Sequence, residues 1–197
     1  MKKLFIATGN ENKLYEFDLI FKEFGLDIEI VSPKDFNDNS DPVEDGKTFE
    51  ENAIIKAKYF YNKYHLPTIA DDSGICVEFL NNFPGIYSAR FMKTHSYEEK
   101  CEALITVLQD SPNRNASFNA VIAYIDEKGD IHTFEGINKG TIAYKCAGNE
   151  GFGYDPIFVI PKYNKTEAEL GLAYKNRYSH RALATQKFVQ YLKENEK

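Results

Sequence analysis

The sequence predicts an α/β fold with a mixed central sheet flanked by helices. Lys3–Ala7 has the composition of a buried strand, and the apolar residues from Leu14 to Phe24 that follow it repeat at helical spacing. Ser117–Asp126 and Ile131–Glu135 are rich in β-forming residues and are joined by a short polar turn, which predicts a hairpin. Because this strand pair lies in series among strand–helix units, the sheet is expected to be mixed rather than purely parallel.

Bulk composition restricts the class of protein. The chain has 197 residues, 43% of them hydrophobic and 27% charged, which is ordinary for a soluble globular protein. The net charge of -6 argues against a surface for nucleic-acid polymers or anionic membranes. Since no linker is long enough to separate independent domains, residues 1–197 are predicted to form a single domain, with room for two packed lobes.

Location is predicted from two further features. The first ten residues contain only a four-residue apolar run, too short for the core of a signal peptide, and no stretch has the length of a membrane span. The three cysteines, Cys76, Cys101 and Cys146, are odd in number, widely spaced and outside any CxxC pattern. This usage fits a reducing compartment and disfavours a disulfide scaffold or a zinc site, so a cytoplasmic location is expected.

The first loop, Thr8–Lys13, joins the first strand to the first helix. Such a loop presents backbone N–H groups and the positive end of the helix dipole to a phosphate. Asn10 is the expected N-cap, and Gly25 is placed to end the helix. Lys13 would lie in the first turn, where its charge opposes the dipole, and a bound polyphosphate would remove that conflict. The GxxxxGK[ST] spacing of a P-loop is absent.

The next segment carries one acid and one lysine of interest. Ile28–Val31 is predicted to be a second strand, and Ser32–Lys47, which includes Glu44, has the composition of a loop. A capping box at Thr48–Glu51 predicts a helix that runs to about Tyr64 and carries Lys56.

Two adjacent carboxylates, Asp71 and Asp72, are the main candidates for catalysis. They follow the apolar run Pro67–Ala70, and Ser73-Gly74 is expected to turn the chain before a second apolar run at Ile75–Leu80. Acids just past a strand lie where open α/β sheets bind ligands. Two like charges this close are unfavourable unless a cation or a shared proton offsets them, and Mg²⁺ is the natural cation. A solvated turn is the alternative.

The second half of the chain contains a further turn, another helix and a glycine-rich loop. Phe83–Arg90 is expected to form a turn and a short extended piece, and a capping box at Ser96–Glu99 opens a helix that ends near Gln109. Gly148–Pro156 offers an aromatic ring, backbone amides and one carboxylate ahead of a strand at Ile157–Ile160. Glycine loops before strands are also common for purely structural reasons.

The C-terminal segment places several cations at a helix start. Thr166–Glu169 suggests a short helix, and the last helix is predicted over His180–Glu194 with Ser179 as its N-cap. His180 and Arg181 would then oppose the helix dipole, which favours an anionic or carbonyl-bearing partner.

Six segments together resemble one known family, the inosine triphosphate pyrophosphatases, which hydrolyse non-standard purine nucleoside triphosphates. They occur in the family's order from the first strand to the last helix, so the resemblance covers essentially the whole chain. The segments are TGNENK at 8–13, EDGKTFEENA at 44–53, ADDSG at 70–74, PGIYSAR at 84–90, GFGYDPIF at 151–158 and SHRALA at 179–184.

The resemblance implies a mixed α/β fold with a long central sheet, two lobes with a nucleotide cleft between them, and usually a homodimer. It implies cleavage of ITP, dITP and XTP between the α- and β-phosphates, giving a nucleoside monophosphate and pyrophosphate. The biological role so implied is the removal of deaminated purines from the nucleotide pool.

The resemblance also implies roles for individual residues. Glu44 and Asp72 match metal-binding acids, here expected to hold Mg²⁺, and Asp72 also matches the general base. The substrate-binding matches are Thr8, Gly9, Asn10, Glu11, Asn12, Lys13, Lys56, Ser73, Phe152, Gly153, Tyr154, Asp155, Lys175, His180 and Arg181. One departure is the segment Gly171–Tyr174, where the family more often carries acidic residues; it leaves the local helix and the placement of Lys175 open.

The expected chemistry is phosphoryl transfer to water, which needs charge neutralisation, an in-line water and a proton acceptor. Metal ligation and base catalysis compete for Asp72, and Asp71 either sets the geometry or binds a second ion. Lys13 and Lys56 would stabilise charge on the departing pyrophosphate. Donors such as backbone N–H groups and Arg181 would favour the 6-oxygen of hypoxanthine or xanthine over the 6-amino group of adenine.

Three other functions remain open from sequence. One is a magnesium-dependent nucleotide hydrolase with broader base choice, although a Nudix-type acidic helix and a Walker lysine are absent. Another is a nucleotide-binding or regulatory module without catalysis, which would not need both Glu44 and Asp72. The last is a structural dimer module, which explains neither glycine loop.

Overall fold

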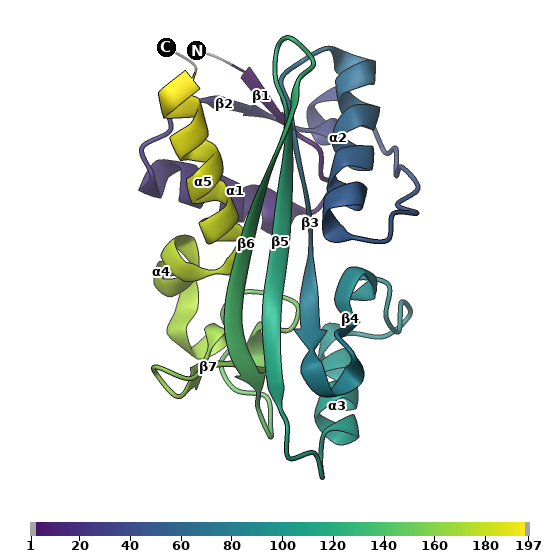
Figure 1. Ribbon diagram of the computed structural model, residues 1–197, viewed down its shortest axis with the longest axis vertical. Helices are drawn as coiled ribbons and strands as arrows, with labels where there is room; N and C mark the ends of the chain where they lie inside the picture. Colours follow the sequence, from purple (N-terminus) through teal and green to yellow (C-terminus); the bar gives the residue numbers. More distant parts are fainter. Residues whose placement is uncertain (1–2, 196–197) are drawn as a thin grey trace. The chain divides into compact units, whose positions relative to one another are not determined.

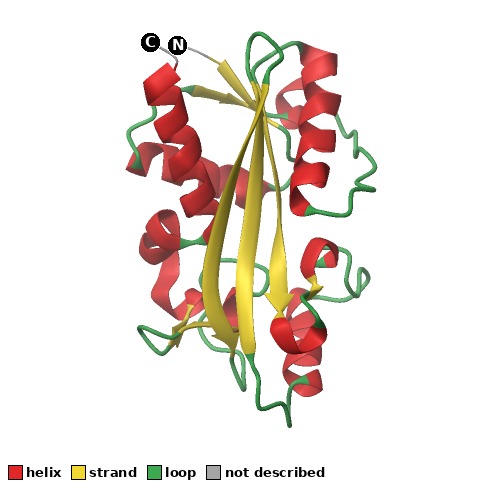
Figure 2. Cartoon of the chain, viewed as in Figure 1, coloured by secondary structure: helices red, strands yellow, loops and turns green. Residues whose placement is uncertain are grey.

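The computed structural model describes residues 3–195. Strands and helices alternate through most of this range, as the sequence predicts (Figure 2). The strands are β1 (Lys3–Ile6), β2 (Glu29–Val31), β3 (Thr68–Val77), β4 (Phe83–Pro84), β5 (Asn115–Ile125), β6 (Ile131–Ile142), β7 (Phe158–Ile160) and β8 (Lys165–Thr166). The α-helices are α1 (Glu11–Glu23), α2 (Phe49–Tyr64), α3 (Tyr97–Val107), α4 (Glu167–Tyr178) and α5 (His180–Asn195).

The sheet is mixed, which confirms the predicted class. Its strand order is β2-β1-β3-β5-β6-β7-β8, with β4 paired to β3. β1 pairs in parallel with both β2 and β3, whereas β3 with β4, β6 with β7 and β7 with β8 pair antiparallel. β5 and β6 are neighbours in the sheet, and the predicted turn between them is closed by hydrogen bonds between Asp126 and Asp130 and between Gly129 and Asp126.

The described chain divides into two compact units. Within residues 3–195, unit 1 comprises residues 3–72, 120–136 and 181–195, and unit 2 comprises residues 73–119 and 137–180. Each unit has a hydrophobic core of its own. Among residues 3–195, no helix is long and apolar enough to cross a bilayer.

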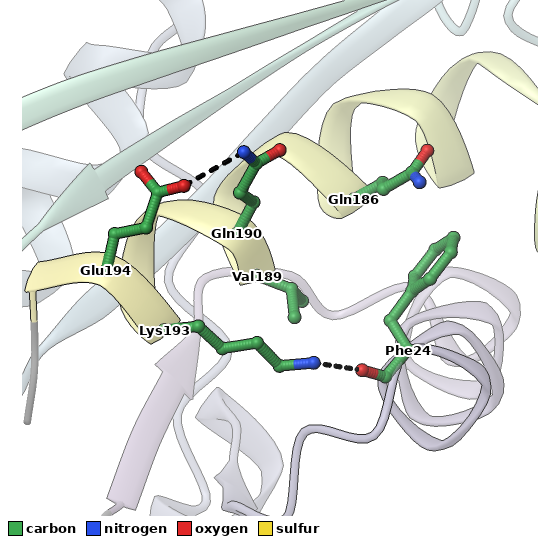
Figure 3. Close-up of a pocket in the computed structure, with 6 residues that line it drawn as sticks. All are labelled: Phe24, Gln186, Val189, Gln190, Lys193 and Glu194. Atoms are coloured by element: carbon green, nitrogen blue, oxygen red, sulfur yellow. Dashed lines mark hydrogen bonds between the residues drawn. The ribbon is translucent and has the colours of Figure 1, made fainter.

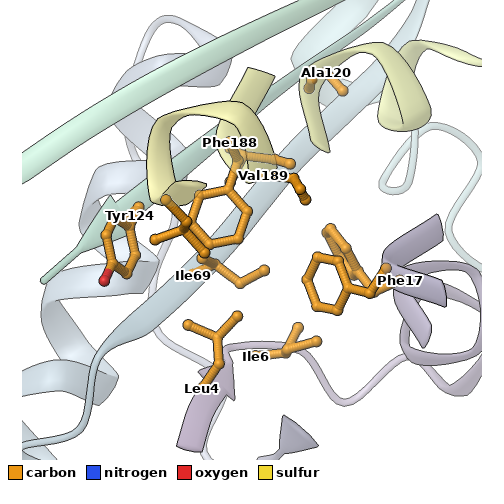
Figure 4. Close-up of a cluster of buried hydrophobic side chains, with 12 residues drawn as sticks. Leu4, Ile6, Phe17, Ile69, Ala120, Tyr124, Phe188 and Val189 are labelled. Carbon is orange, nitrogen blue, oxygen red and sulfur yellow. The ribbon is translucent and has the colours of Figure 1, made fainter. Parts of the chain in front are cut away.

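Unit 1 is layered, with α1 and α5 on one face of its strands and α2 on the other (Figure 1). Successive side chains of a strand point to opposite faces, so each strand supplies alternate residues to two cores. Leu4 and Ile6 pack toward α1 and α5, and Phe5 packs toward α2. The α1/α5 core is filled mainly by the side chains shown in Figure 4, including Phe17, Ile69, Tyr124, Phe188 and Val189.

Unit 2 is built around α3 and the ends of the long strands. Its core contains Ile75 and Val77 of β3, Cys101 and Leu104 of α3, and Phe158 of β7, all of them buried. The buried Arg114 is balanced by backbone dipoles, since its guanidinium donates to the carbonyl oxygens of Leu108, Ile142 and Ala143. These bonds tie the end of α3 to the end of β6.

Most predicted helix ends are confirmed. The Asn10 side chain caps α1 and Gly25, at φ 68°, follows its end. Thr48 caps α2 through the Glu51 amide, but the Glu51 carboxylate accepts from the Lys47 amide and so does not complete the box.

The later helices differ from the prediction at one end. Reciprocal capping boxes open α3 at Ser96 and α4 at Thr166, but α3 ends at Val107, two residues before the predicted end. The last helix begins at His180 as predicted, and Ser179, its predicted N-cap, is the C-cap of α4.

The turn predicted at Ser73-Gly74 is wrong. β3 runs without interruption from Thr68 to Val77, so the two acids lie inside a strand rather than after one. Polar residues with turn propensity are held in a strand here because nine of the ten positions of β3 are buried, and because the acids find charged and amide partners. Tertiary contacts therefore override local propensity at this point.

Candidate active site

The two adjacent acids of β3 point to opposite faces of unit 1. Ile69 belongs to the core beneath α1 and α5, and Ala70 belongs to the core beneath α2. The next two residues continue this alternation. Asp71 contacts side chains of α1 and α5, whereas Asp72 contacts a side chain of α2. Strand geometry thus gives neighbouring carboxylates separate surroundings and separate chemistry.

Asp71 is the centre of a buried charge network. Its Oδ1 lies 3.1 Å from the ammonium of Lys13, and its Oδ2 accepts from Nε and Nη2 of Arg181 at 3.2 and 3.0 Å. Arg181 also donates from Nη1 to Glu16 Oε2 at 2.5 Å. Burial alone would raise the pKa of Asp71, but the charges of Lys13 and Arg181 outweigh it and hold that pKa far below its usual range.

This network offsets the unfavourable interaction, expected from the sequence, between basic residues and the positive ends of two helix dipoles. Lys13 and Arg181 lie in the first turns of α1 and α5, where a positive charge is unfavourable. Asp71 and Glu16, both nearly fully buried, supply the opposing negative charge from within the protein. The cations at these two helix starts therefore do not by themselves require an anionic ligand.

Asp72 has a different environment, formed by α2 and the loop before it. Asn52 of α2 donates from Nδ2 to Asp72 Oδ2 at 3.0 Å, and Asn52 Oδ1 accepts the backbone N–H of Gly46 at 2.9 Å. A Cβ on Gly46 would lie 2.7 Å from Asn52 Oδ1, so only glycine lets the loop approach this closely. The loop that carries Glu44 is thereby anchored beside Asp72.

Lys56 links Glu44 to the backbone of β3. Its ammonium pairs with Glu44 and donates to the backbone carbonyl of Asp71 at 3.0 Å. Burial raises the pKa of Asp72, while Lys56 and Asn52 lower it and the charge of Glu44 raises it further. The carboxylate of Asp72 is therefore more basic than an ordinary aspartate.

The chemistry of Glu44 and Asp72 fits a hard divalent cation. Both supply carboxylate oxygens, and their mutual repulsion is what a cation would relieve. Within residues 3–195, no group of three or more His, Cys, Asp or Glu side chains is arranged to hold a metal by itself. A cation bound here would therefore complete its coordination with water and phosphate, as Mg²⁺ commonly does.

The loop at 8–13 presents its backbone at the start of α1. Asn10 Oδ1 accepts from the amides of Asn12 and Lys13 at 2.9 and 3.3 Å, and the Asn10 amide donates to Thr8 Oγ1 at 3.2 Å. The carboxylate of Glu11 is on the surface and pairs with Lys34 at 2.7 Å. The Asn10 side chain and the amides of Asn12 and Lys13 are thus engaged in capping, and a phosphate at this helix start would replace Asn10 as the acceptor of those amides.

Unit 2 contains a second group of predicted site residues, in the glycine-rich loop and α4. Asp155 is buried, and its Oδ2 accepts from Lys175 Nζ at 2.6 Å and from the Phe152 amide at 2.7 Å. The Lys175 ammonium also lies 4.9 Å from the centroid of the Phe152 ring. Gly151 has φ 80°, and a Cβ there would lie 2.1 Å from Asp155 Oδ2, so the turn requires glycine.

Further contacts hold the remaining predicted residues of unit 2. The Tyr154 hydroxyl donates to the Ser88 carbonyl at 2.9 Å, which links the glycine-rich loop to the PGIYSAR segment. The His180 ring stacks on Phe118 with centroids 4.6 Å apart. Ser73, half-buried in β3, also belongs to this unit.

The Gly171–Tyr174 segment, where the sequence departs from the family, contains a break in α4. Gly171 has φ 73° and ψ -174°, and the Leu172 amide donates to Glu150 Oε2 at 3.1 Å. Lys175 is nevertheless buried against Asp155. α4 is therefore broken within this segment, and the ion pair between Lys175 and Asp155 forms beyond the break.

Two residues of the site were missed from the sequence. Glu16 is 3% exposed and lies one helical turn after Lys13, so its position on the buried face of α1 was a usable signal. Asn52 is fully buried on the core-facing side of α2, where an amide needs a polar partner. Their partners, Arg181 and Asp72, are distant in sequence.

A surface hollow of unit 1 is distinct from these groups. It is lined by Phe24 after α1 and by residues of α5: Gln186, Val189, Gln190, Lys193 and Glu194 (Figure 3). Lys193 donates to the Phe24 carbonyl and Gln190 donates to Glu194, so these polar groups bind one another. None of the predicted site residues lines it.

Comparison with known proteins agrees with the fold. Among curated relatives, dITP/XTP pyrophosphatases of Aquifex aeolicus and Leptospira interrogans are 40% and 41% identical, covering 99% and 98% of this chain and 98% of each relative. The solved structure of the Staphylococcus aureus Ham1 protein has a TM-score of 0.87 at 38% identity and covers 100% of both chains. Residues 4–191 match the Ham1 family, and the chain belongs to that family.

Proposed function

We propose that this protein hydrolyses non-standard purine nucleoside triphosphates, ITP, dITP and XTP, to the nucleoside monophosphate and pyrophosphate. The observation that carries the proposal is the placement of Asp72: a buried, unusually basic carboxylate held by Asn52 beside Glu44 and Lys56. The names of the curated relatives, dITP/XTP pyrophosphatases, support the same activity. Removal of deaminated purines from the nucleotide pool is the corresponding biological role.

In this proposal Asp72 is the general base. Asn52 fixes one of its oxygens, and the carboxylate accepts a proton from the water that attacks the α-phosphorus. The elevated pKa suits this task because a base is most effective when its pKa approaches the working pH. Lys56, together with Lys13, stabilises negative charge on the departing pyrophosphate.

Glu44 and Asp72 are proposed to hold Mg²⁺. When bound there, the cation would neutralise phosphate charge and lower the pKa of water. Lys56 pairs with Glu44 and so holds its carboxylate in place near Asp72. The amides of Thr8–Lys13 are proposed to bind the triphosphate, as helix starts bind phosphates.

Base recognition is assigned in this proposal to unit 2 and to the start of α5. Phe152, Gly153, Tyr154 and Asp155 border the base, and Asp155 fixes both the Phe152 amide and Lys175. Lys175, His180 and Arg181 are the proposed readers, with the guanidinium of Arg181 oriented by Glu16 and Asp71. Protein N–H donors that face the 6-position of the purine favour the 6-oxygen of hypoxanthine or xanthine and disfavour the 6-amino group of adenine.

The test is pyrophosphate release from dITP, XTP, dATP and dGTP, each with and without Mg²⁺. Release from dITP and XTP alone, dependent on the metal, is the expected result. Release from all four would overturn the selectivity argument and favour a hydrolase of broader base choice. Absence of release from every substrate would contradict hydrolysis and favour a nucleotide-binding module.

Two further proposals concern the oligomeric state and the cellular location of the protein. We propose that the enzyme is a homodimer, as the family resemblance implies, and light scattering on the purified chain tests this. We also propose a reducing, cytoplasmic location, in keeping with three cysteines that are all free thiols in the structure. Localisation of a tagged chain tests the latter.

A further inference from the structure

One side chain, Asp38, ties the loop between β2 and α2 to the last turn of α2. Its Oδ2 accepts from Lys63 Nζ at 2.8 Å and from the Tyr64 hydroxyl at 2.6 Å. Its Oδ1 accepts from the amide and the hydroxyl of Ser40 at 2.9 and 2.5 Å, and Lys63 Nζ also donates to that hydroxyl oxygen at 3.1 Å. These four residues, Asp38, Ser40, Lys63 and Tyr64, are called the Asp38 clip below.

The Asp38 clip is supported by the core of unit 1. The side chain of Asp38 is 7% exposed, and the Tyr64 ring stacks on Phe36 and Phe5 with centroids 4.2 and 5.0 Å apart. Phe5 is fully buried in the core beneath α2. Hydrogen bonds from Lys63 and the other two partners hold the pKa of Asp38 well below its usual range, so the carboxylate is charged at neutral pH.

The far end of the same loop is tied to the beginning of α2. There the Gly46 amide donates to Asn52 Oδ1 at 2.9 Å. Residues 39–45 lie between this contact and the Asp38 clip, and they belong to no helix or strand. The loop therefore runs back along α2 from its last turn to its first (Figure 1), and it carries Glu44 on the way.

The length of the loop does not by itself fix the position of Glu44. At about 1.5 Å per residue, the stretch of α2 from Asn52 to Lys63 is roughly 17 Å long. An extended chain from Asp38 to Gly46 would reach about 26–29 Å. The loop is thus longer than the distance it has to span, so the contacts at its two ends are needed to define its path.

We propose that Asp38 is a positioning residue for the cation site: by tying the loop to α2 it fixes Glu44 beside Asp72, and so sets the affinity for the divalent cation. This inference rests on the proposed function, in which Glu44 and Asp72 hold Mg²⁺. Groups that directly orient a metal ligand commonly change affinity by about 10–100-fold. Asp38 acts through the chain, and Lys56 also pairs with Glu44, so loss of the clip should weaken binding by about 3- to 10-fold.

The experiment measures Mn²⁺ binding to the full chain without nucleotide, from the electron paramagnetic resonance signal of the free ion. Mn²⁺ is a suitable probe because it takes the same oxygen ligands as Mg²⁺. Asp38→Ala should raise the Kd for Mn²⁺ by about 3- to 10-fold, and Glu44→Gln, which removes a proposed ligand, should raise it further. In dITP hydrolysis, Asp38→Ala should raise the Mg²⁺ concentration for half-maximal rate by a similar factor and leave kcat at saturating Mg²⁺ little changed.

The matched control is Asp41→Ala. It removes the same charge from the same loop, but Asp41 is exposed and lies outside the Asp38 clip. Because exposed charges are screened by salt, its Kd should stay within about 2-fold of wild type. An equal rise in Kd for Asp41→Ala and Asp38→Ala would show a charge effect and overturn the positioning role, as would an unchanged Kd for Asp38→Ala.

A milder variant, Tyr64→Phe, keeps the stacked ring and removes one hydrogen bond to Asp38. It should raise the Kd for Mn²⁺ in the same direction. The double variant Asp38→Ala/Tyr64→Phe should bind no more weakly than Asp38→Ala, because both changes break the same contact. Additive effects of the two substitutions would contradict a shared action through the Asp38 clip.

Limited proteolysis separates failure of this inference from failure of the proposed function. With a protease of broad specificity, cleavage within residues 39–45 should be faster in Asp38→Ala than in wild type or Asp41→Ala, and no metal is needed. Equal cleavage rates would overturn the anchoring of the loop. A wild-type chain that binds Mn²⁺ no better than Glu44→Gln would overturn the proposed cation site and the effect on affinity, whereas the cleavage rates would still decide the anchoring.

Discussion

Replacement of Asp71 by Asn tests the role of the buried charge network. The substitution keeps the shape of the side chain but removes the charge that faces Lys13 and Arg181. Asp71 is 1% exposed, and N–H groups from both cations lie within 3.2 Å of its oxygens. Arg181 would then keep its ion pair with Glu16, whereas Lys13 would lose its ion pair with Asp71.

The magnitude follows from the burial of the network. Removing one partner of a buried ion pair costs about 3–5 kcal/mol, because an uncompensated charge is left inside. For a domain of this size each kcal/mol lowers Tm by about 2–4 °C, so Asp71→Asn should lower Tm by about 6–20 °C. Thermal and urea unfolding at pH 7 measure the change.

The pH dependence has a defined sign. The pKa of Asp71 is lowered in the folded protein, so its contribution to stability is present above the unfolded value of about 3.9. That contribution is lost as pH falls from there toward the folded pKa. The difference between wild type and Asp71→Asn should therefore be constant from pH 7 to 5 and should shrink below about pH 4.

A matched control is Asp18→Asn, which removes the carboxylate of a surface pair with Lys22 and should leave Tm almost unchanged. Asp71→Asn combined with Arg181→Met should cost less than the two single changes added together, since each removes the other's partner. A Tm for Asp71→Asn within about 2 °C of wild type would refute the reasoning.

Two further predictions concern close contacts in each unit. Gly151→Ala should raise KM for dITP and lower Tm more than the control Gly25→Ala. Both positions have positive φ, but only at Gly151 would a Cβ clash with Asp155. Equal effects of the two substitutions would contradict this. Asn52→Ala should lower kcat and destabilise the protein by about 1–3 kcal/mol, because Asp72 and the Gly46 amide each lose a buried hydrogen-bond partner. An unchanged kcat would contradict this role of Asn52.

Local patterns were sufficient to predict most secondary structure. Helix starts at Asn10, Thr48, Ser96 and Thr166 were visible because capping depends on residues within one turn. The hairpin between β5 and β6 was visible for the same reason. These features need no knowledge of which segments meet in space.

The partners of the candidate site residues could not be predicted in this way. Asp71 and Arg181 are 110 residues apart, and Asp72 and Asn52 are 20 apart. The prediction places the acids after the end of a strand because Ser73-Gly74 favours a turn locally, whereas burial on both faces keeps β3 extended. Once the strand is continuous, alternation separates Asp71 from Asp72, which the sequence alone left open.

The most direct test of these separate roles is the turnover of Asp72→Asn on dITP, measured beside its Tm in EDTA. Burial raises the pKa of Asp72, so its ionised form destabilises the folded protein above that pKa, and a neutral Asn should leave Tm unchanged or higher. Loss of the base should lower kcat by about 10²–10⁴-fold in a protein that remains folded. Turnover close to wild type in a folded Asp72→Asn protein would contradict the assignment of Asp72 as the base.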